Sequence, residues 1–138
     1  MSNIRRVRLP ENHPVFGSNK IFDLFKYSPA VHANGLVFIA GQVGIRPDGS
    51  IPETVEEQIR VAFERLGAIL THEGLGFEDL IELVSYHVDI DQQLTAFREI
   101  KDEFIAADFP AWTILGVHAL ARDTLRVEIK AVAAATRK

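Results

Sequence analysis

The stretch YSPAVHANGLVFIAGQ, residues 27–42, predicts a two-stranded hairpin around a tight turn. Asn34-Gly35 is the dipeptide best suited to the positive φ angles of a type I′ turn. The arm that follows, residues 36–40, is apolar throughout, which is typical of a central strand buried on both faces. Pro29 removes a backbone donor from the first arm, so this arm is expected at an edge or a bulge.

Working outward from the hairpin, the pattern predicts two helices and four more strands. Residues 54–57 (TVEE) form a capping-box pattern, and apolar residues then recur at helical spacing until Gly74. A second, shorter amphipathic helix is expected around residues 94–105, before Pro110. Residues 10–26, with two prolines and Gly17, predict an irregular loop. The expected strands cover residues 4–8, 27–33, 36–42, 80–89, 112–118 and 124–134.

This order of elements predicts an α+β fold, a two-layer sandwich with two helices on one face of a six-stranded mixed sheet. The strand–helix–strand crossovers are expected to be right-handed, with locally parallel pairing. Only short turns separate the predicted helices and strands, so residues 1–138 are expected to form one domain. Two helices cover only one face of such a sheet, and the other face must meet water or another subunit.

Composition excludes several classes of function. The net charge is −4, acids and bases alternate along the chain, and no basic cluster of the kind that binds nucleic acid is present. The absence of cysteine excludes a disulfide, a thiol nucleophile and a thiolate metal site. No histidine pair has metal-ligand spacing, so no metal is expected. The N-terminus lacks an apolar signal segment and no apolar run approaches the roughly 20 residues of a membrane span, so we expect a cytoplasmic protein with no membrane partner.

The last expected strand places a carboxylate on the uncovered face. Leu125, Val127, Ile129 and Ala131 share one face and should lie under the helices, while Arg126, Glu128 and Lys130 share the other. If subunits associate through the uncovered face, Glu128 becomes a partly buried carboxylate at an interface. Charges in such positions usually have a partner or a chemical task.

Four segments in one register resemble a known family. They are Tyr27–Val31, the strand and Gly-Gln pair of residues 36–42, residues 109–112 (FPAW), which resemble a Phe-Pro-Ala-Arg signature, and residues 126–131 (RVEIKA), which resemble a closing strand with a central Glu-Ile. Together they run from about residue 27 to residue 135 and resemble the reactive-intermediate deaminase (RidA, or YjgF) family, also called endoribonuclease L-PSP.

The resemblance implies a chorismate-mutase-like fold and a homotrimer with three ligand clefts between subunits. Active members of the family hydrolyse enamines and imines to a keto acid and ammonia without a cofactor. In these members an arginine clamps the substrate carboxylate, a glutamate near the nitrogen positions or activates water, and a tyrosine contributes to the pocket.

Carried over to this chain, the resemblance implies Glu128 and Tyr27 as catalytic residues and Gln42 and Gly41 as substrate-binding residues. Ala40 stands where the family usually has serine or threonine, and Trp112 stands at the arginine position. An indole offers one N–H and cannot neutralise an anion. The chain therefore resembles an arginine-lacking subgroup, and activity on 2-aminoacrylate is not expected.

We therefore expect Trp112, Tyr27 and Glu128 to converge in one pocket at the subunit interface, with Gln42 close by. Such a pocket would suit a neutral or cationic planar ligand stacked on the indole. His118 shares a strand face with Trp112 if the strand stays regular, which makes it a further substrate-binding candidate. Arg98 and Arg122 are the cations that could replace the missing arginine.

Three classes of function remain open. The first is an enzyme that hydrolyses, and so deaminates, an imine-like or enamine-like metabolite. The second is a small-molecule-binding protein that kept the cleft and lost the chemistry. The third is an endoribonuclease, against which the acidic charge balance counts. The retained Glu128 favours the enzyme, whereas Trp112 and Ala40 favour the binding protein.

Overall fold

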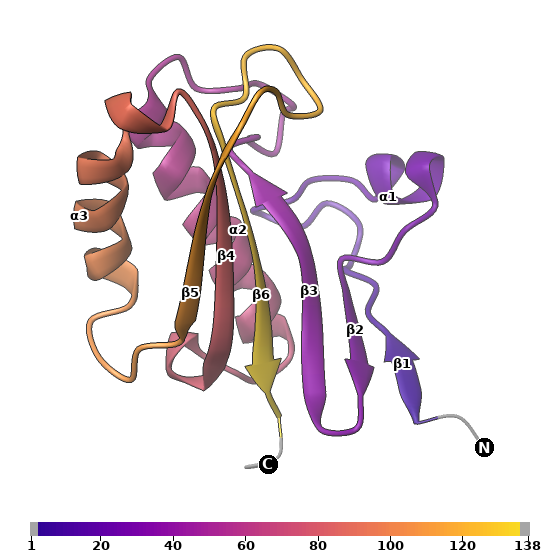
Figure 1. Cartoon of the computed structure of the whole chain (residues 1–138). Helices are drawn as coiled ribbons and strands as arrows, with labels where there is room; N and C mark the ends of the chain where they lie inside the picture. Colours follow the sequence, from indigo (N-terminus) through magenta and orange to yellow (C-terminus); the bar gives the residue numbers. More distant parts are fainter. Residues whose placement is uncertain (1–2, 136–138) are drawn as a thin grey trace.

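The computed structural model describes residues 3–135 and forms a six-stranded sheet covered on one side by two long helices (Figure 1). The strands lie in the order β1-β2-β3-β6-β4-β5. β4 and β5 are parallel, and every other neighbouring pair is antiparallel, so the predicted mixed sheet is confirmed. The strands are β1 (Ile4–Arg6), β2 (Ala30–Ala33), β3 (Leu36–Val43), β4 (Leu80–Val88), β5 (Ala111–Val117) and β6 (Val127–Ala134).

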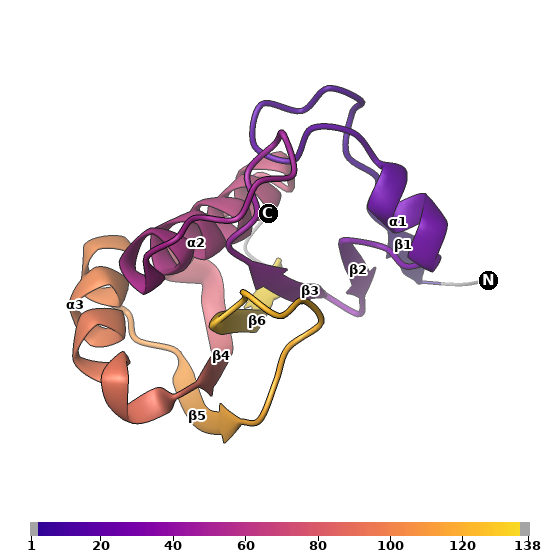
Figure 2. The ribbon, with the colours of Figure 1, turned by 90° about the horizontal axis from the view of Figure 1, so that it is seen from above.

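The two predicted helices are α2 (Val55–His72) and α3 (Leu94–Phe104), and Figure 2 shows both on the same side of the sheet. Thr54 caps α2, since its side chain accepts a hydrogen bond from the Glu57 N–H at 3.2 Å. Short 3₁₀ turns, Phe77–Asp79 and Ile90–Gln92, flank β4. No helix within residues 3–135 combines the length and the apolar content needed to cross a membrane.

The prediction of an irregular loop over residues 10–26 is wrong in one part, because α1 (Lys20–Phe25) lies within it. A helix of six residues is too short to show a helical period in the sequence. It ends at Lys26, whose left-handed conformation (φ 59°) closes the last turn.

The hairpin forms around the predicted turn, but the predicted burial of its second arm on both faces is wrong, since Phe38 in this arm is 47% exposed. Asn34 and Gly35 both have positive φ, 53° and 79°, which matches the twist of the flanking strands. The first arm is shorter than predicted and begins at Ala30, directly after Pro29.

The core lies between the helices and the sheet. The Phe63 ring of α2 packs against Phe77, Phe97 and Phe104 with ring centroids 5.2–6.4 Å apart. The inward set of β6, which is Val127, Ile129, Ala131 and Ala133, is buried beneath the helices. β6 starts later than predicted because Gln58 Oε1 accepts the Arg126 N–H at 2.8 Å.

The opposite sheet face, here called the open face, is not covered by any helix of the described part of the chain (Figure 2). Cross-strand pairs place its members side by side: Phe38 beside Val132, Lys130 beside Val84, and Glu128 beside Tyr86. Thr113 and Leu115 of β5 continue the same rows. This face is mostly apolar and partly exposed, with Phe38 47% exposed.

Candidate functional site

One edge of β3 loses its strand partner near its C-terminal end. β2 pairs with β3 only as far as Ile39, and Ala40 then donates its N–H to the Pro29 carbonyl at 3.0 Å. Beside β6 the register shifts, so that Ala40 and Gly41 together oppose Lys130 in a β-bulge. A pocket of about 410 Å³ opens here, lined by Phe16, Ser18, Lys20, Ile21, Phe22, Tyr27, Gly41, Val43, the segment 45–49 and Arg65.

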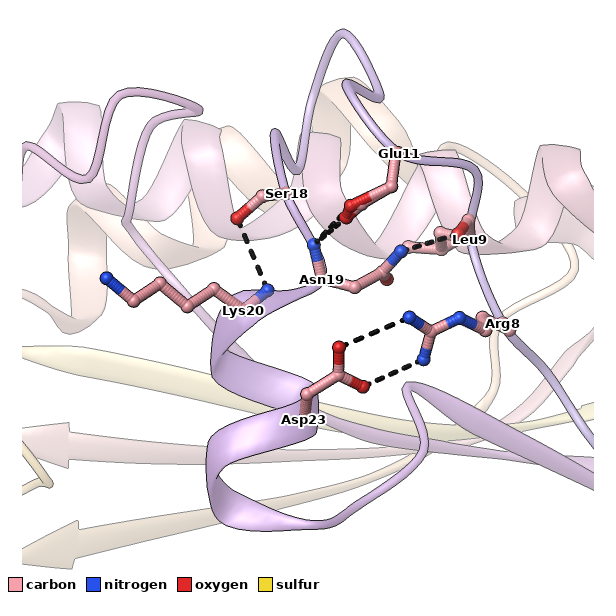
Figure 3. A network of polar contacts seen from close by, with 7 residues as sticks. All are labelled: Arg8, Leu9, Glu11, Ser18, Asn19, Lys20 and Asp23. Atoms are coloured by element: carbon pink, nitrogen blue, oxygen red, sulfur yellow. Dashed lines mark hydrogen bonds and ion pairs between the residues drawn. The ribbon is translucent and has the colours of Figure 1, made fainter.

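A polar network holds α1 beside this pocket (Figure 3). Arg8 donates two hydrogen bonds to the Asp23 carboxylate, at 2.8 and 3.2 Å. Glu11 Oε1 accepts the Asn19 N–H at 2.8 Å, and the buried Asn19 side chain donates to the Leu9 carbonyl at 2.9 Å. These bonds fix the segment that carries Lys20, Phe22 and Tyr27 into the pocket wall.

Glu128 lies directly over Gly41 on the open face. A Cβ added at Gly41 would stand 1.9 Å from Glu128 Oε2, so only glycine leaves room for this carboxylate. Glu128 is half-buried and, within residues 3–135, has no ion-pair partner, while its neighbour Arg126 pairs with Asp89 at 2.7 Å. Burial raises the pKa of Glu128 above the usual range of a glutamate.

Tyr27 interacts electrostatically with two charged groups, Arg65 and Glu128. Its ring packs against Phe22 with centroids 5.0 Å apart. Burial raises the pKa of the Tyr27 hydroxyl, Arg65 acts to lower it, and Glu128 raises it further. Tyr27 therefore stays protonated at neutral pH and lies within electrostatic range of both Arg65 and Glu128.

Arg65 of α2 is a pocket residue that the sequence analysis missed. Its Nε donates to Gln42 Oε1 at 3.1 Å and its Nη1 to the Ile45 carbonyl at 3.0 Å, while the guanidinium lies 4.4 Å from the centroid of the Phe16 ring. Burial lowers the pKa of Arg65 to about 10, which still leaves it charged at neutral pH. One signal in the sequence could have identified Arg65. It follows Gln58 by seven residues, or two helical turns, so these two polar residues share one face of the helix.

Gln42 supports the pocket without lining it. Its side chain lies on the helix-covered face, is 1% exposed, accepts from Arg65 and donates to the Ala40 carbonyl at 3.0 Å. The predicted substrate-binding residue is thus a group that orients Arg65.

The structure places Trp112 away from Glu128, so the predicted convergence of these two residues is wrong for this chain. Trp112 pairs with Leu83 on the helix-covered face, where its ring lies 5.7 Å from Phe97 and its Nε1 donates to Ser85 Oγ at 2.9 Å. Lys101 of α3 covers the indole, with Nζ 4.8 Å from the ring centroid. Strand alternation separates Trp112 from Glu128, and the expectation of a ligand stacked on the indole loses its basis.

The other residues singled out in the sequence lie outside the pocket. β5 ends at Val117, so His118 is an exposed residue of the following loop and shares no strand face with Trp112. Arg98 is exposed on α3, and Arg122 is exposed in the loop before β6. Neither arginine lines the pocket beside Tyr27. Among residues 3–135, no three His, Asp or Glu side chains are arranged to hold a metal ion.

The pocket therefore combines a phenol, a guanidinium and, across Gly41, a carboxylate with a raised pKa. A carboxylate of this kind can take a proton from water, and the two donors can hold a polar substrate.

A family model described as Endoribonuclease L-PSP matches residues 18–135. The RutC family protein YjgH of Escherichia coli K12 is 36% identical over 114 residues, covering 82% of this chain and 87% of YjgH. A solved structure of a protein YjgH superimposes with a TM-score of 0.79 at 35% identity, over 91% of this chain and 97% of that chain. E. coli TdcF with bound serine gives a TM-score of 0.73 at 28% identity, over 78% of this chain and 87% of TdcF.

The name of E. coli TdcF refers to a reactive intermediate deaminase, and this relative is 30% identical over 111 residues, covering 78% of this chain and 84% of TdcF. The family model spans every element of the sheet except β1, and the fold agrees over most of each chain. The chain belongs to the RidA/YjgF family, whose family model carries the description Endoribonuclease L-PSP.

Proposed function

We propose that this protein hydrolyses an imine or enamine of a small metabolite to a carbonyl compound and ammonia, with Glu128 as the general base. The observation that carries the proposal is the half-buried Glu128 carboxylate, which has no ion-pair partner within residues 3–135 and is held over Gly41 beside the Tyr27 pocket. Its raised pKa makes it a better proton acceptor near neutral pH than an ordinary glutamate.

The proposed reaction needs no cofactor. Glu128 removes a proton from water as the water oxygen bonds to the imine carbon, and the C=N π electrons move to nitrogen. Protonated Glu128 then returns this proton to the nitrogen, which gives a carbinolamine and restores the carboxylate. Transfer of the hydroxyl proton to the amine, followed by cleavage of the C–N bond, releases ammonia and leaves the C=O group. Tyr27, protonated at neutral pH, donates a hydrogen bond to the substrate.

We also propose that the site is completed by association of three chains through the open face. Phe38, Val84, Leu115 and Val132 form an apolar surface on this face, and Glu128 lies within the same rows. Exposed apolar surface of this kind is typical of a protein interface. A neighbouring subunit packed here would exclude bulk water from Glu128 and close the pocket.

The second candidate is a binding protein without catalysis. Ala40 favours it, because this residue borders Gly41 and supplies no hydroxyl where the family usually has one. Both candidates use the same pocket, so turnover decides between them.

A competition assay separates the two functions. An amino-acid oxidase would supply 2-imino acids in situ, an amine oxidase would supply an uncharged imine, and semicarbazide would trap either. We expect the protein to reduce semicarbazone formation and to accelerate ammonia release from at least one imine. Saturable binding of the carbonyl products with no acceleration from any imine would contradict the enzyme and support the binding protein.

A further inference from the structure

Among the residues that the structure describes, Arg65 keeps N–H donors that no protein group accepts. Its two hydrogen bonds, to Gln42 Oε1 and to the Ile45 carbonyl, involve Nε and Nη1, and within residues 3–135 no carboxylate forms an ion pair with it. A guanidinium carries five N–H donors in a planar fork. The remaining donors belong to a side chain that lines the pocket beside Tyr27 and Gly41.

Arg65 is also held rigidly, as a ligand-binding cation must be. The ring of Phe16 lies beneath one face of the guanidinium at 4.4 Å, and Gln42 and the Ile45 carbonyl fix its plane. Gln42 is itself fixed by its bond to the Ala40 carbonyl. A fixed fork loses little conformational entropy when it binds a planar anion.

The charges around the pocket favour an anion at the Arg65 end. Lys20 and Arg46 line the same pocket, and Asp48 is the one acid among its lining residues. The Glu128 carboxylate lies on the other side of Gly41, so a ligand that reaches from Arg65 toward Gly41 has a cation at one end and a base at the other.

We infer that Arg65 is the anion-binding residue of this pocket and that its ligand is a small carboxylate of the 2-oxo or 2-imino acid class. Arg65 and the Tyr27 hydroxyl supply donors for the two carboxylate oxygens, and the imine carbon then points toward Glu128. This inference rests on the proposed function and deepens it: Arg65 from α2 supplies the charge that Trp112 of β5 does not. It replaces the expectation of a neutral or cationic planar ligand stacked on the indole.

Equilibrium binding of pyruvate and of its neutral analogue pyruvamide tests the inference. The wild-type protein should bind pyruvate more tightly than pyruvamide. Arg65→Gln should lose pyruvate affinity by about 10- to 100-fold, the usual cost of a charge-assisted hydrogen bond, and should bind the two compounds equally. Arg65→Lys should keep part of the preference. Arg60→Gln is the matched control, because Arg60 lies exposed on the same helix and pairs with Glu103.

The preference for pyruvate over pyruvamide separates recognition from structural damage. If Arg65 had only a structural role, its replacement would loosen the pocket. The affinities for pyruvate and pyruvamide would then fall together, and the ratio of the two affinities would stay unchanged. If Arg65→Gln does not fold, the side-chain Nε–H resonance of Arg65 in the wild-type protein gives the answer, since pyruvate and not pyruvamide should shift it.

Equal affinity of the wild-type protein for the two compounds, no pyruvate binding, or an unchanged preference in Arg65→Gln would each overturn the inference. The proposed hydrolysis would survive any of these results if an uncharged imine were still turned over in a Glu128-dependent way. Conversely, loss of all turnover with intact, Arg65-dependent pyruvate binding would refute the hydrolysis and leave this inference standing.

Discussion

Glu128 Oε2 occupies the space that a side chain at Gly41 would fill, with an added Cβ only 1.9 Å away. The β-bulge of β3 and the closing strand β6 meet at this point. The glycine therefore positions the carboxylate, and the two residues function as one unit.

Gly41→Ala should displace the carboxylate and spare the fold. The atoms in the way form the end of a flexible side chain, which can swing aside. We expect a melting temperature close to that of the wild type and a fall in ammonia release of about 100-fold, the cost of misplacing a catalytic group by about 1 Å. Gly116→Ala is the control, because its added methyl meets Ile90 at an ordinary 3.4 Å. Unchanged turnover in Gly41→Ala would show that the position of Glu128 is unimportant.

The open face should hold the subunits together. Phe38→Asp puts a charge in the proposed interface, where burial of an unpaired carboxylate is strongly unfavourable. Sedimentation should give three times the 15.4 kDa chain mass for the wild type and a monomer for Phe38→Asp. Phe109→Asp, at a loop residue that is 74% exposed, should remain trimeric. A wild-type monomer at micromolar concentration would refute the proposed assembly.

Trp112 should contribute to stability and not to ligand binding. Removing the indole from beneath α3 takes away its stacking contact with Phe97 and the hydrogen bond that its Nε1–H donates to Ser85 Oγ. Trp112→Ala should cost about 3 kcal/mol of unfolding free energy, the lower end for a large aromatic because the site is partly exposed. Trp112→Phe keeps the stacking, loses the hydrogen bond and should cost about 1 kcal/mol. Denaturant unfolding measures both values, and loss of pyruvate affinity in a folded Trp112→Phe would contradict this assignment.

His87 should make the protein less stable in mild acid. It is fully buried, with Nε2 2.8 Å from Ser85 Oγ and Nδ1 2.9 Å from Gln93 Oε1. Ser85 Oγ already accepts from Trp112, so its hydroxyl donates to Nε2 of the neutral His87 ring. The Gln93 amide nitrogen already donates to two carbonyls, so Gln93 Oε1 accepts from the His87 Nδ1–H. Burial lowers the pKa of His87, while the hydrogen bond to Gln93 opposes the shift.

Because the folded pKa of His87 lies below the unfolded value of 6.5, the unfolded chain takes up this proton first. Stability should therefore fall as the pH decreases from about 6.5 through the folded pKa. Unfolding free energies measured from pH 7.5 to 4.5 should show a shallower decline for His87→Gln than for the wild type. Identical slopes would show that His87 takes no part in the acid sensitivity.

Much of the fold could be predicted because local signals and periodicity agree. Asn34-Gly35, Thr54 and the apolar stripe of α2 each act within a few residues, and each forms as expected. The element α1 could not be predicted, because it is held by contacts distant in sequence, from Arg8 and Leu9. The order of strands in the sheet likewise depends on packing that no local pattern records.

The site was only partly predictable for a related reason. Alternation along β6 put Glu128 on the open face, and the family pattern pointed to Tyr27 and Gly41. Alternation in β5 alone does not decide which face Trp112 occupies, and the pairing of Trp112 with Leu83 of β4 puts it on the helix-covered face. Arg65 lies on a helix with no family motif, and its place in the pocket depends on tertiary contacts with Gln42, the Ile45 carbonyl and Phe16.

The pH dependence of ammonia release by the wild type and by Glu128→Gln tests the central claim most directly. If Glu128 is the general base, kcat/KM of the wild type should fall as the pH drops through the pKa of Glu128, at a midpoint above the 4.5 of an ordinary glutamate. Glu128→Gln should lose this acid limb and at least about 100-fold in rate. Glu99→Gln, at an exposed acid on α3, should behave as the wild type. A Glu128→Gln protein that retains the wild-type rate and the same acid limb would contradict the account.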